Sequence, residues 1–189
     1  IDEDLDQSLA RLTDFLKIPS ISTDPGYADR CLEAAQWLVT DLKSLGATAS
    51  IRETPKHPMV VGTIGEGDRH LLFYGHYDVQ PVDPLELWTT DPFSPVIEDG
   101  RIRARGAADD KGQLMTFVEA CRAWIAVHGS LPCKITFFFE GEEESGSPSL
   151  VPYLRAHREA LKADLALICH PGLFDPHTPA IIPSLPGPP

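Results

Sequence analysis

Residues 135–144 place the strongest constraint on how this chain folds. The apolar run Ile135–Phe139 (ITFFF) has the length and composition of a strand buried in a core. Four carboxylates follow it within five positions, at Glu140, Glu142, Glu143 and Glu144. Two like charges about 4 Å apart repel by roughly 4 kcal/mol at an effective dielectric constant of about 20. Acids gathered at the end of a buried strand therefore require protonation or bound cations.

Strand-like and helix-like patterns alternate along the rest of the chain. The sequence predicts helices over residues 3–17, 28–45, 111–128 and 148–162. It predicts strands over residues 48–52, 59–64, 71–74, 101–105, 133–139 and 165–169. A proline-rich connection over residues 80–100 is long enough to indicate a functional loop. The alternation predicts an α/β fold with a mostly parallel mixed sheet flanked by helices.

The domain organisation follows from where these patterns stop. We expect one domain over residues 1–170. Residues 171–189 are rich in proline and lack periodicity, so we expect an irregular tail there, as a truncated continuation of the fold.

Composition excludes several classes of partner and location. The net charge of -12 argues against nucleic acid and against an anionic membrane surface. No apolar run approaches the roughly 18 residues of a membrane-spanning helix, and the first residues do not resemble a signal peptide. The four cysteines are far apart, without a CxxC pair, which predicts free thiols in a reducing compartment. We therefore expect a cytoplasmic protein.

Polar side chains follow four of the predicted strands. In open α/β sheets, ligands bind outside the carboxyl ends of the strands. One strand runs into His76 and Asp78, a second into Asp109 and Asp110, a third into the glutamate cluster, and a fourth into His170. We expect these strand ends to be neighbours and to share a site.

The residue types at these ends suit metal binding. His76 and Asp78 project from the same face of an extended chain, so the acid can orient the imidazole for a metal ion. The alternative is a histidine–aspartate hydrogen bond at a turn with no metal. Asp109 and Asp110 precede a predicted helix, and the alternative for one of them is an N-cap, with Lys111 as the neutralising charge. Imidazole together with carboxylates suits Zn²⁺, with Co²⁺ or Mn²⁺ as other candidates.

Three stretches together resemble the M20 family of metallopeptidases. They are LLFYGHYDVQPVD, DGRIRARGAADDKGQ and FFFEGEEESGS, and the resemblance is strongest to the dipeptidase branch, with its carnosinase-like and Cys-Gly dipeptidases. It implies two divalent metal ions and hydrolysis of the amide bond of dipeptides or other small peptides. An N-acyl amino acid amidohydrolase of the same family and a non-catalytic metal-binding remnant are the alternatives. It also implies a homodimer for the full-length protein.

The resemblance assigns roles residue by residue. His76 matches the first metal ligand and Asp78 the acid that orients it. Asp109 matches the carboxylate that bridges both metals, and Glu144 matches a ligand of the second. Glu143 matches the general base that takes a proton from the attacking water and passes it to the leaving amine.

The resemblance also implies a cis peptide between Asp109 and Asp110. Glu140 and Glu142 match no catalytic role, so we expect them to lie close to the ligands or in solvent.

The sequence departs from the family pattern in two places. The family has an acidic metal ligand where this chain has His170, so His170 is either a ligand of a different kind or not a ligand. We expect no counterpart, within these residues, of the family's lid and dimerisation domain with its final histidine ligand. We do not expect His177, in the tail, to replace that histidine.

Overall fold

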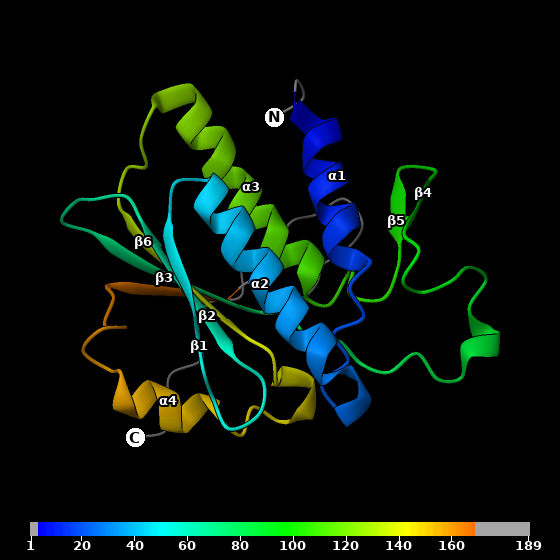
Figure 1. Cartoon of the computed structure of the whole chain (residues 1–189). Coiled ribbons are helices and arrows are strands. Elements are labelled where there is room, and N and C mark those ends of the chain that lie inside the picture. The colour runs from blue at the N-terminus through cyan, green and yellow to red at the C-terminus, as the bar shows by residue number, and fades with distance from the viewer. Residues whose placement is uncertain (1–3, 169–189) are drawn as a thin grey trace, which may run out of the picture.

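The computed structural model describes residues 4–168, with helices on both faces of one main sheet (Figure 1). The helices are α1 (Leu5–Leu16), α2 (Ala28–Ser44), α3 (Lys111–His128) and α4 (Leu150–Ala156). The main sheet contains β1 (Thr48–Arg52), β2 (Met59–Ile64), β3 (His70–His76), β6 (Lys134–Glu140) and β7 (Leu165–Ile168). A separate hairpin contains β4 (Val96–Glu98) and β5 (Arg101–Arg103). Three short 3₁₀ helices are η2 (Pro25–Tyr27), η3 (Leu85–Leu87) and η4 (Glu143–Ser145).

The strand order of the main sheet is β1-β2-β6-β3-β7. β3 pairs in parallel with both β6 and β7, whereas β2 is antiparallel to both β1 and β6. Within residues 4–168, therefore, β2 alone runs against the other strands of this sheet. The predicted mostly parallel mixed sheet with flanking helices is confirmed.

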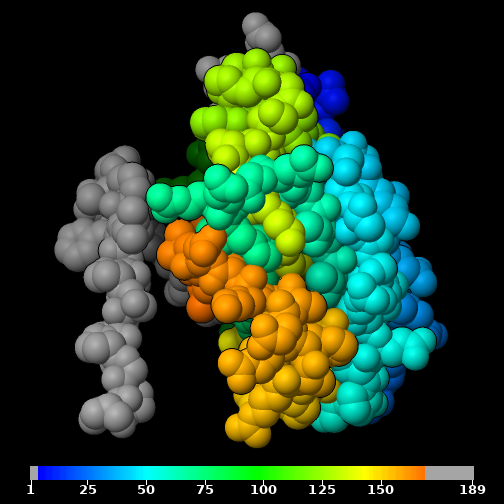
Figure 2. Space-filling view, turned by 90° about the vertical axis from the view of Figure 1, so that its left-hand side faces the viewer, coloured from blue at the N-terminus to red at the C-terminus, as the bar shows by residue number. Residues whose placement is uncertain are grey.

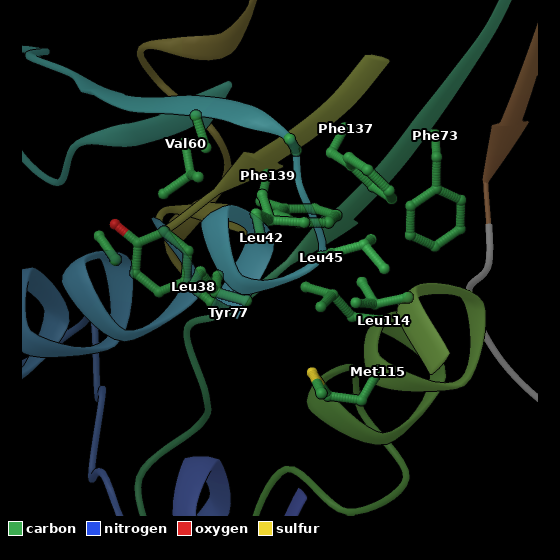
Figure 3. Packing of buried hydrophobic residues seen from close by; sticks show 14 of the residues in the cluster. Leu38, Leu42, Leu45, Val60, Phe73, Tyr77, Leu114, Met115, Phe137 and Phe139 are labelled. Carbon is green, nitrogen blue, oxygen red and sulfur yellow. The ribbon is translucent and has the colours of Figure 1, made fainter. Parts of the chain in front are cut away.

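Strand β6 explains why the phenylalanine run is unbroken. Successive side chains of a strand point to opposite faces. Phe137 and Phe139 pack into the larger core with α2 and α3, and Figure 3 shows them near Phe73 and Leu114. Phe138 faces the other way, into a smaller core that α4 covers. Because helices cover both faces, each apolar position of the strand gains from burial, by about 1.5–3 kcal/mol for a large side chain.

Strand β7 lies at the edge of the sheet and differs from β6 in its exposure. Leu165 and Ile168 are each 62% exposed. Figure 2 shows β7 beside α4 at the surface of the molecule. No helix among residues 4–168 has the length and apolar character to cross a bilayer.

Several element predictions were wrong in extent or placement. The strand predicted over residues 71–74 is the longer β3, and β4 lies within the loop predicted over residues 80–100. The helix predicted over residues 148–162 ends at Ala156, because residues 157–160 are exposed and only Leu161 returns to the smaller core. The strand predicted over residues 101–105 pairs with β4 in the hairpin and is not part of the main sheet. The division into a domain over 1–170 and a tail over 171–189 stays a prediction, and the tail lies outside the described residues.

Candidate metal centre and active site

The candidate site lies where β3 and β6 end side by side. The parallel register pairs His76, the last residue of β3, with Glu140, the last residue of β6. The next residues keep the two chains together, because the Tyr77 amide donates to the Glu140 carbonyl at 2.9 Å. Both segments that follow, at 77–78 and 141–144, therefore leave the sheet at the same point.

The two ring nitrogens of His76 face different partners. Nδ1 lies 3.3 Å from Asp78 Oδ1 and 3.2 Å from the Asp78 carbonyl oxygen. Nε2 lies 3.1 Å from Asp109 Oδ1 and 4.0 Å from Glu143 Oε2. Burial favours the neutral ring, but the hydrogen bond and charge of Asp78, with the nearby carboxylates, raise the pKa of His76 to about 9. One nitrogen is thus held by Asp78, and the other is directed toward carboxylates.

Asp78 holds both the histidine and the glutamate turn. It is fully buried, and its Oδ1 faces His76 and also accepts from the Glu143 amide at 3.2 Å. Its Oδ2 accepts from the Glu144 amide at 3.0 Å and from Ser22 Oγ at 2.6 Å. Through these bonds the start of η4 is fixed relative to His76.

Asp109 reaches the site by a route that the sequence did not predict. It lies in the turn between β5 and α3, and it does not end a strand of the main sheet. The predicted cis peptide between Asp109 and Asp110 is confirmed. Asp110 precedes α3 but makes no side-chain capping bond to it, and its Oδ2 accepts from the backbone amide of His76 at 3.1 Å. A Cβ at Gly75 would lie 2.9 Å from that oxygen, so a glycine permits this approach.

The glutamates divide into a buried pair and a partly exposed pair. Glu140 and Glu142 are 0% and 1% exposed, so the solvated alternative for them is wrong. Glu140 accepts hydrogen bonds from the Tyr74 hydroxyl and, at 2.9 Å, from Ser147 Oγ. Its Oε2 has no hydrogen-bond partner among the described residues, and burial raises the pKa of this carboxyl.

Glu142 connects the loop between β1 and β2 to the start of α4. Its Oε1 accepts from the His57 amide at 2.9 Å, Ser149 Oγ at 3.0 Å and Thr54 Oγ1 at 3.2 Å. Its Oε2 accepts from the Ser149 amide at 2.9 Å. Four donors for one buried carboxylate indicate a structural role.

Glu143 and Glu144 have the opposite environment. The Glu143 side chain is 36% exposed and faces His76. Glu144 Oε2 accepts from Gln80 Nε2 at 2.6 Å, and burial raises the pKa of Glu144 more than this bond lowers it. Both side chains are therefore accessible from the solvent side of the site.

The donor set fits a divalent cation. His76 Nε2 and Asp109 Oδ1 are 3.1 Å apart, and two ligands at zinc bond lengths of about 2.0–2.1 Å in tetrahedral geometry are separated by roughly 3.3 Å. Across residues 4–168, no third His, Cys, Asp or Glu completes a group around these two atoms. The resemblance assigns Glu144 as a further ligand. To bind the cation, the Glu144 side chain would have to leave its hydrogen bond with Gln80. His170, the other predicted ligand, lies outside the described residues.

Two residues beside the site were given no role from the sequence, and a third, Lys111, was considered only as a neutralising charge. Ser22 contacts Asp78 from a distant segment, and Gln80, which lies within a quoted motif but was given no role, contacts Glu144. Lys111 follows the aspartate pair, yet it is fully buried and donates to the carbonyls of Phe15 and Ile18 at 3.1 and 2.7 Å. Burial lowers the pKa of Lys111 to about 7.

Comparison with known proteins decides the family. A model of Peptidase family M20/M25/M40 matches residues 72–183. This chain belongs to that family. M20 peptidases are metal-dependent hydrolases, which agrees with the imidazole and carboxylate donors gathered at the ends of β3 and β6.

Three similar proteins illustrate the range of this family. A Cys-Gly metallodipeptidase (dug1) of Schizosaccharomyces pombe is 33% identical over 182 residues, covering 89% of this chain and 38% of that protein. A succinyl-diaminopimelate desuccinylase of Cupriavidus pinatubonensis is 37% identical over 150 residues, covering 73% of this chain and 39% of that protein. The crystal structure of human carnosine dipeptidase 1 superposes with a TM-score of 0.85 and 28% identity, covering 92% of this chain and 40% of that one. The chain thus spans about two fifths of the length of these relatives.

Proposed function

We propose that this chain carries the metal-binding and catalytic part of a dipeptidase that hydrolyses the amide bond of small peptides. The observation that carries the proposal is the convergence of His76 Nε2, Asp109 and Glu143 beside the ends of two parallel strands. The dipeptidase names of two similar proteins favour this substrate class. A cytoplasmic location and a homodimer of the full-length protein belong to the same proposal.

His76, Asp109 and Glu144 would hold two divalent cations, with Asp109 as the shared ligand and His170 as a further candidate ligand. Zn²⁺ is the ion that these donors suit best, with Co²⁺ and Mn²⁺ as alternatives. Bound cations of this kind lower the pKa of a coordinated water toward neutrality and polarise a carbonyl oxygen.

The chain's own residues supply the proton transfer and its geometry. Glu143 accepts the proton of the attacking water at its carboxylate and then donates it to the leaving amine. Its backbone amide is held by Asp78, which also holds His76 Nδ1, so base and ligand share one anchor. Because the Glu143 side chain is partly exposed, a substrate can approach it from solvent.

Glu143→Gln tests this assignment. For a dipeptide that the wild-type protein cleaves, we expect the rate of hydrolysis to fall by about 10²–10⁴-fold, since a general base is lost. Zinc content, measured by atomic emission on the same preparation, should stay at the wild-type value. Loss of metal together with activity would instead make Glu143 a ligand or a structural residue.

A second candidate function is hydrolysis of N-acyl amino acids, which the similarity to a desuccinylase favours. A panel containing Cys-Gly, β-Ala-His and N-succinyl amino acids separates the two. Turnover of the succinylated substrates alone would favour the amidohydrolase. Bound zinc without turnover of any member of the panel would favour a non-catalytic remnant.

A further inference from the structure

The segment Ile18–Ser22, which we call the site strap, lies directly against the candidate site. In the sequence, this segment indicates only that the helix predicted over residues 3–17 has ended. In the structure, Ser20 Oγ donates to the Tyr77 carbonyl at 2.6 Å, and the Val79 amide donates to the Ser20 carbonyl at 2.9 Å. Ile21 forms an isolated parallel bridge with Val79. The strap therefore runs beside residues 77–79, which follow β3.

The second serine of the strap makes a different bond from the first. Ser22 Oγ donates to Asp78 Oδ2 at 2.6 Å, and both side chains are buried, at 8% and 0% exposure. The remaining hydrogen bonds to this carboxylate come from the His76 ring and from the backbone amides of Glu143 and Glu144. Among these donors, Ser22 alone lies outside the segments that follow β3 and β6. Its hydroxyl therefore holds the Asp78 rotamer from a third part of the chain.

We propose that Ser22 is a positioning residue of the metal site, acting through Asp78 on His76 and on the Glu143–Glu144 turn. The inference rests on the proposed function in so far as His76 is a metal ligand. Each oxygen of Asp78 has two donors, so the carboxylate is held in one orientation. Without the hydroxyl, Oδ2 retains only the Glu144 amide, and rotation of the carboxylate releases His76 Nδ1.

The strap itself does not depend on this bond. Ser20 and Ile21 still attach it to residues 77–79, and the ring of His57 donates from Nε2 to the Ser22 carbonyl at 3.0 Å. Removal of the Ser22 hydroxyl should therefore disturb the orientation of Asp78 more than the fold. Partners that orient a metal ligand typically contribute about 10- to 100-fold to metal affinity.

The chain offers a matched control in Ser20. Ser22→Ala and Ser20→Ala remove the same group from the same strap, and each breaks one buried 2.6 Å bond. Only Ser22 contacts the Asp78 carboxylate. We expect Ser22→Ala to weaken Zn²⁺ binding by about 10- to 100-fold in competition with a chromophoric chelator. Ser20→Ala should stay within about 3-fold of wild type, and Ser22→Thr, which keeps a hydroxyl, should recover most of the affinity.

A second readout does not involve metal. In long-range ¹H–¹⁵N spectra of the chelator-treated protein, Ser22→Ala should shift the His76 ring signals, and Ser20→Ala should leave them in place. Equal effects of the two alanine variants on both readouts would overturn the inference. Failure of wild type to bind Zn²⁺, Co²⁺ or Mn²⁺, with His76 signals that still respond to Ser22→Ala alone, would overturn the proposed function and support the positioning of His76 through Asp78.

Discussion

The four glutamates at the end of β6 and directly after it occupy two environments, although they lie within five positions of one another. Glu140 and Glu142 are buried, and their carboxylates accept hydrogen bonds from β3, from the loop after β1 and from the start of α4. Glu143 and Glu144 are partly exposed and face His76 and Gln80. Cations at the site therefore need to balance mainly the exposed pair, because the protein's own donors satisfy much of the buried pair.

The packing of Gly141 explains where this division begins. A Cβ at Gly141 would lie 2.3 Å from the Tyr77 ring, so the chain passes Tyr77 in close contact as it leaves the sheet. Glu140 and Glu142, on either side of this glycine, are consequently enclosed. η4 then turns the chain, and Glu143 and Glu144 emerge at the site. The buried pair therefore serves the structure and the exposed pair serves the site, and substitutions can test this difference.

The largest expected difference is between Glu142→Ala and Glu143→Ala in unfolding free energy. Glu142→Ala leaves the amides of His57 and Ser149 and the Ser149 hydroxyl without their acceptor, whereas the Thr54 hydroxyl keeps the His57 carbonyl at 2.6 Å. Each unsatisfied buried group costs about 1–3 kcal/mol, so we expect a total loss of about 3–5 kcal/mol. Urea denaturation in the presence of a chelator measures it.

Glu143→Ala is the matched control, and it should cost less than about 1 kcal/mol because the side chain is partly exposed. The backbone bond from Glu143 to Asp78 is unchanged by this substitution. Similar losses for both variants would remove the distinction between the two pairs.

The next effect is a pH dependence that belongs to Glu140. Its pKa is raised above the unfolded value by burial, so between the two values the folded chain binds more protons than the unfolded chain. This contribution to stability is fully present below the unfolded pKa and is lost as pH rises through the folded pKa. Glu140→Gln cannot titrate, so wild type should lose stability relative to this variant as pH rises from about 4.5, by up to about 1.4 kcal/mol per pH unit.

Urea denaturation of chelator-treated wild type and Glu140→Gln at several pH values between about 4.5 and 7 measures this difference. A constant difference across that range would mean that burial does not shift Glu140 in the folded chain.

Much of the fold could be predicted from the sequence because its signals are local. Helix α3 begins and ends where the pattern predicts, and the apolar run of β6 identifies a strand that is covered on both faces. The hairpin pairing of residues 101–103 was missed although a local signal marks it. Asp99 and Gly100, both with positive φ, form the two-residue turn between β4 and β5, and Asp-Gly is typical of such turns.

The site shows where local signals stop. The motifs identify His76, Asp109 and Glu143, and the structure brings these three together. Burial of Glu142 depends on donors 85 and 88 positions earlier in the chain, and Ser22 reaches Asp78 across 56 positions. Contacts between residues so far apart have no signature in one sequence.

The smallest effect on stability, and the sharpest test of the exposed pair, is expected for Glu144→Gln. The amide keeps an oxygen that can accept from Gln80, so without metal the unfolding free energy should change by less than about 0.5 kcal/mol. In the presence of Zn²⁺, the unfolding free energies of wild type and Glu144→Gln should differ. A ligand that binds only the folded chain stabilises it by RT ln(1 + [L]/Kd), about 2.7 kcal/mol at 100 times Kd.

Calorimetry with and without Zn²⁺ therefore reports what Glu144 contributes. Removal of zinc with a chelator should lower the unfolding midpoint of wild type more than that of Glu144→Gln, because loss of a carboxylate ligand weakens binding. Equal zinc-dependent shifts would place Glu144 outside the metal centre. In that case the Glu144 carboxylate would stay bonded to Gln80 both with and without zinc. Of the exposed pair, only Glu143 would then take part in the reaction, and Glu144 would have a structural role.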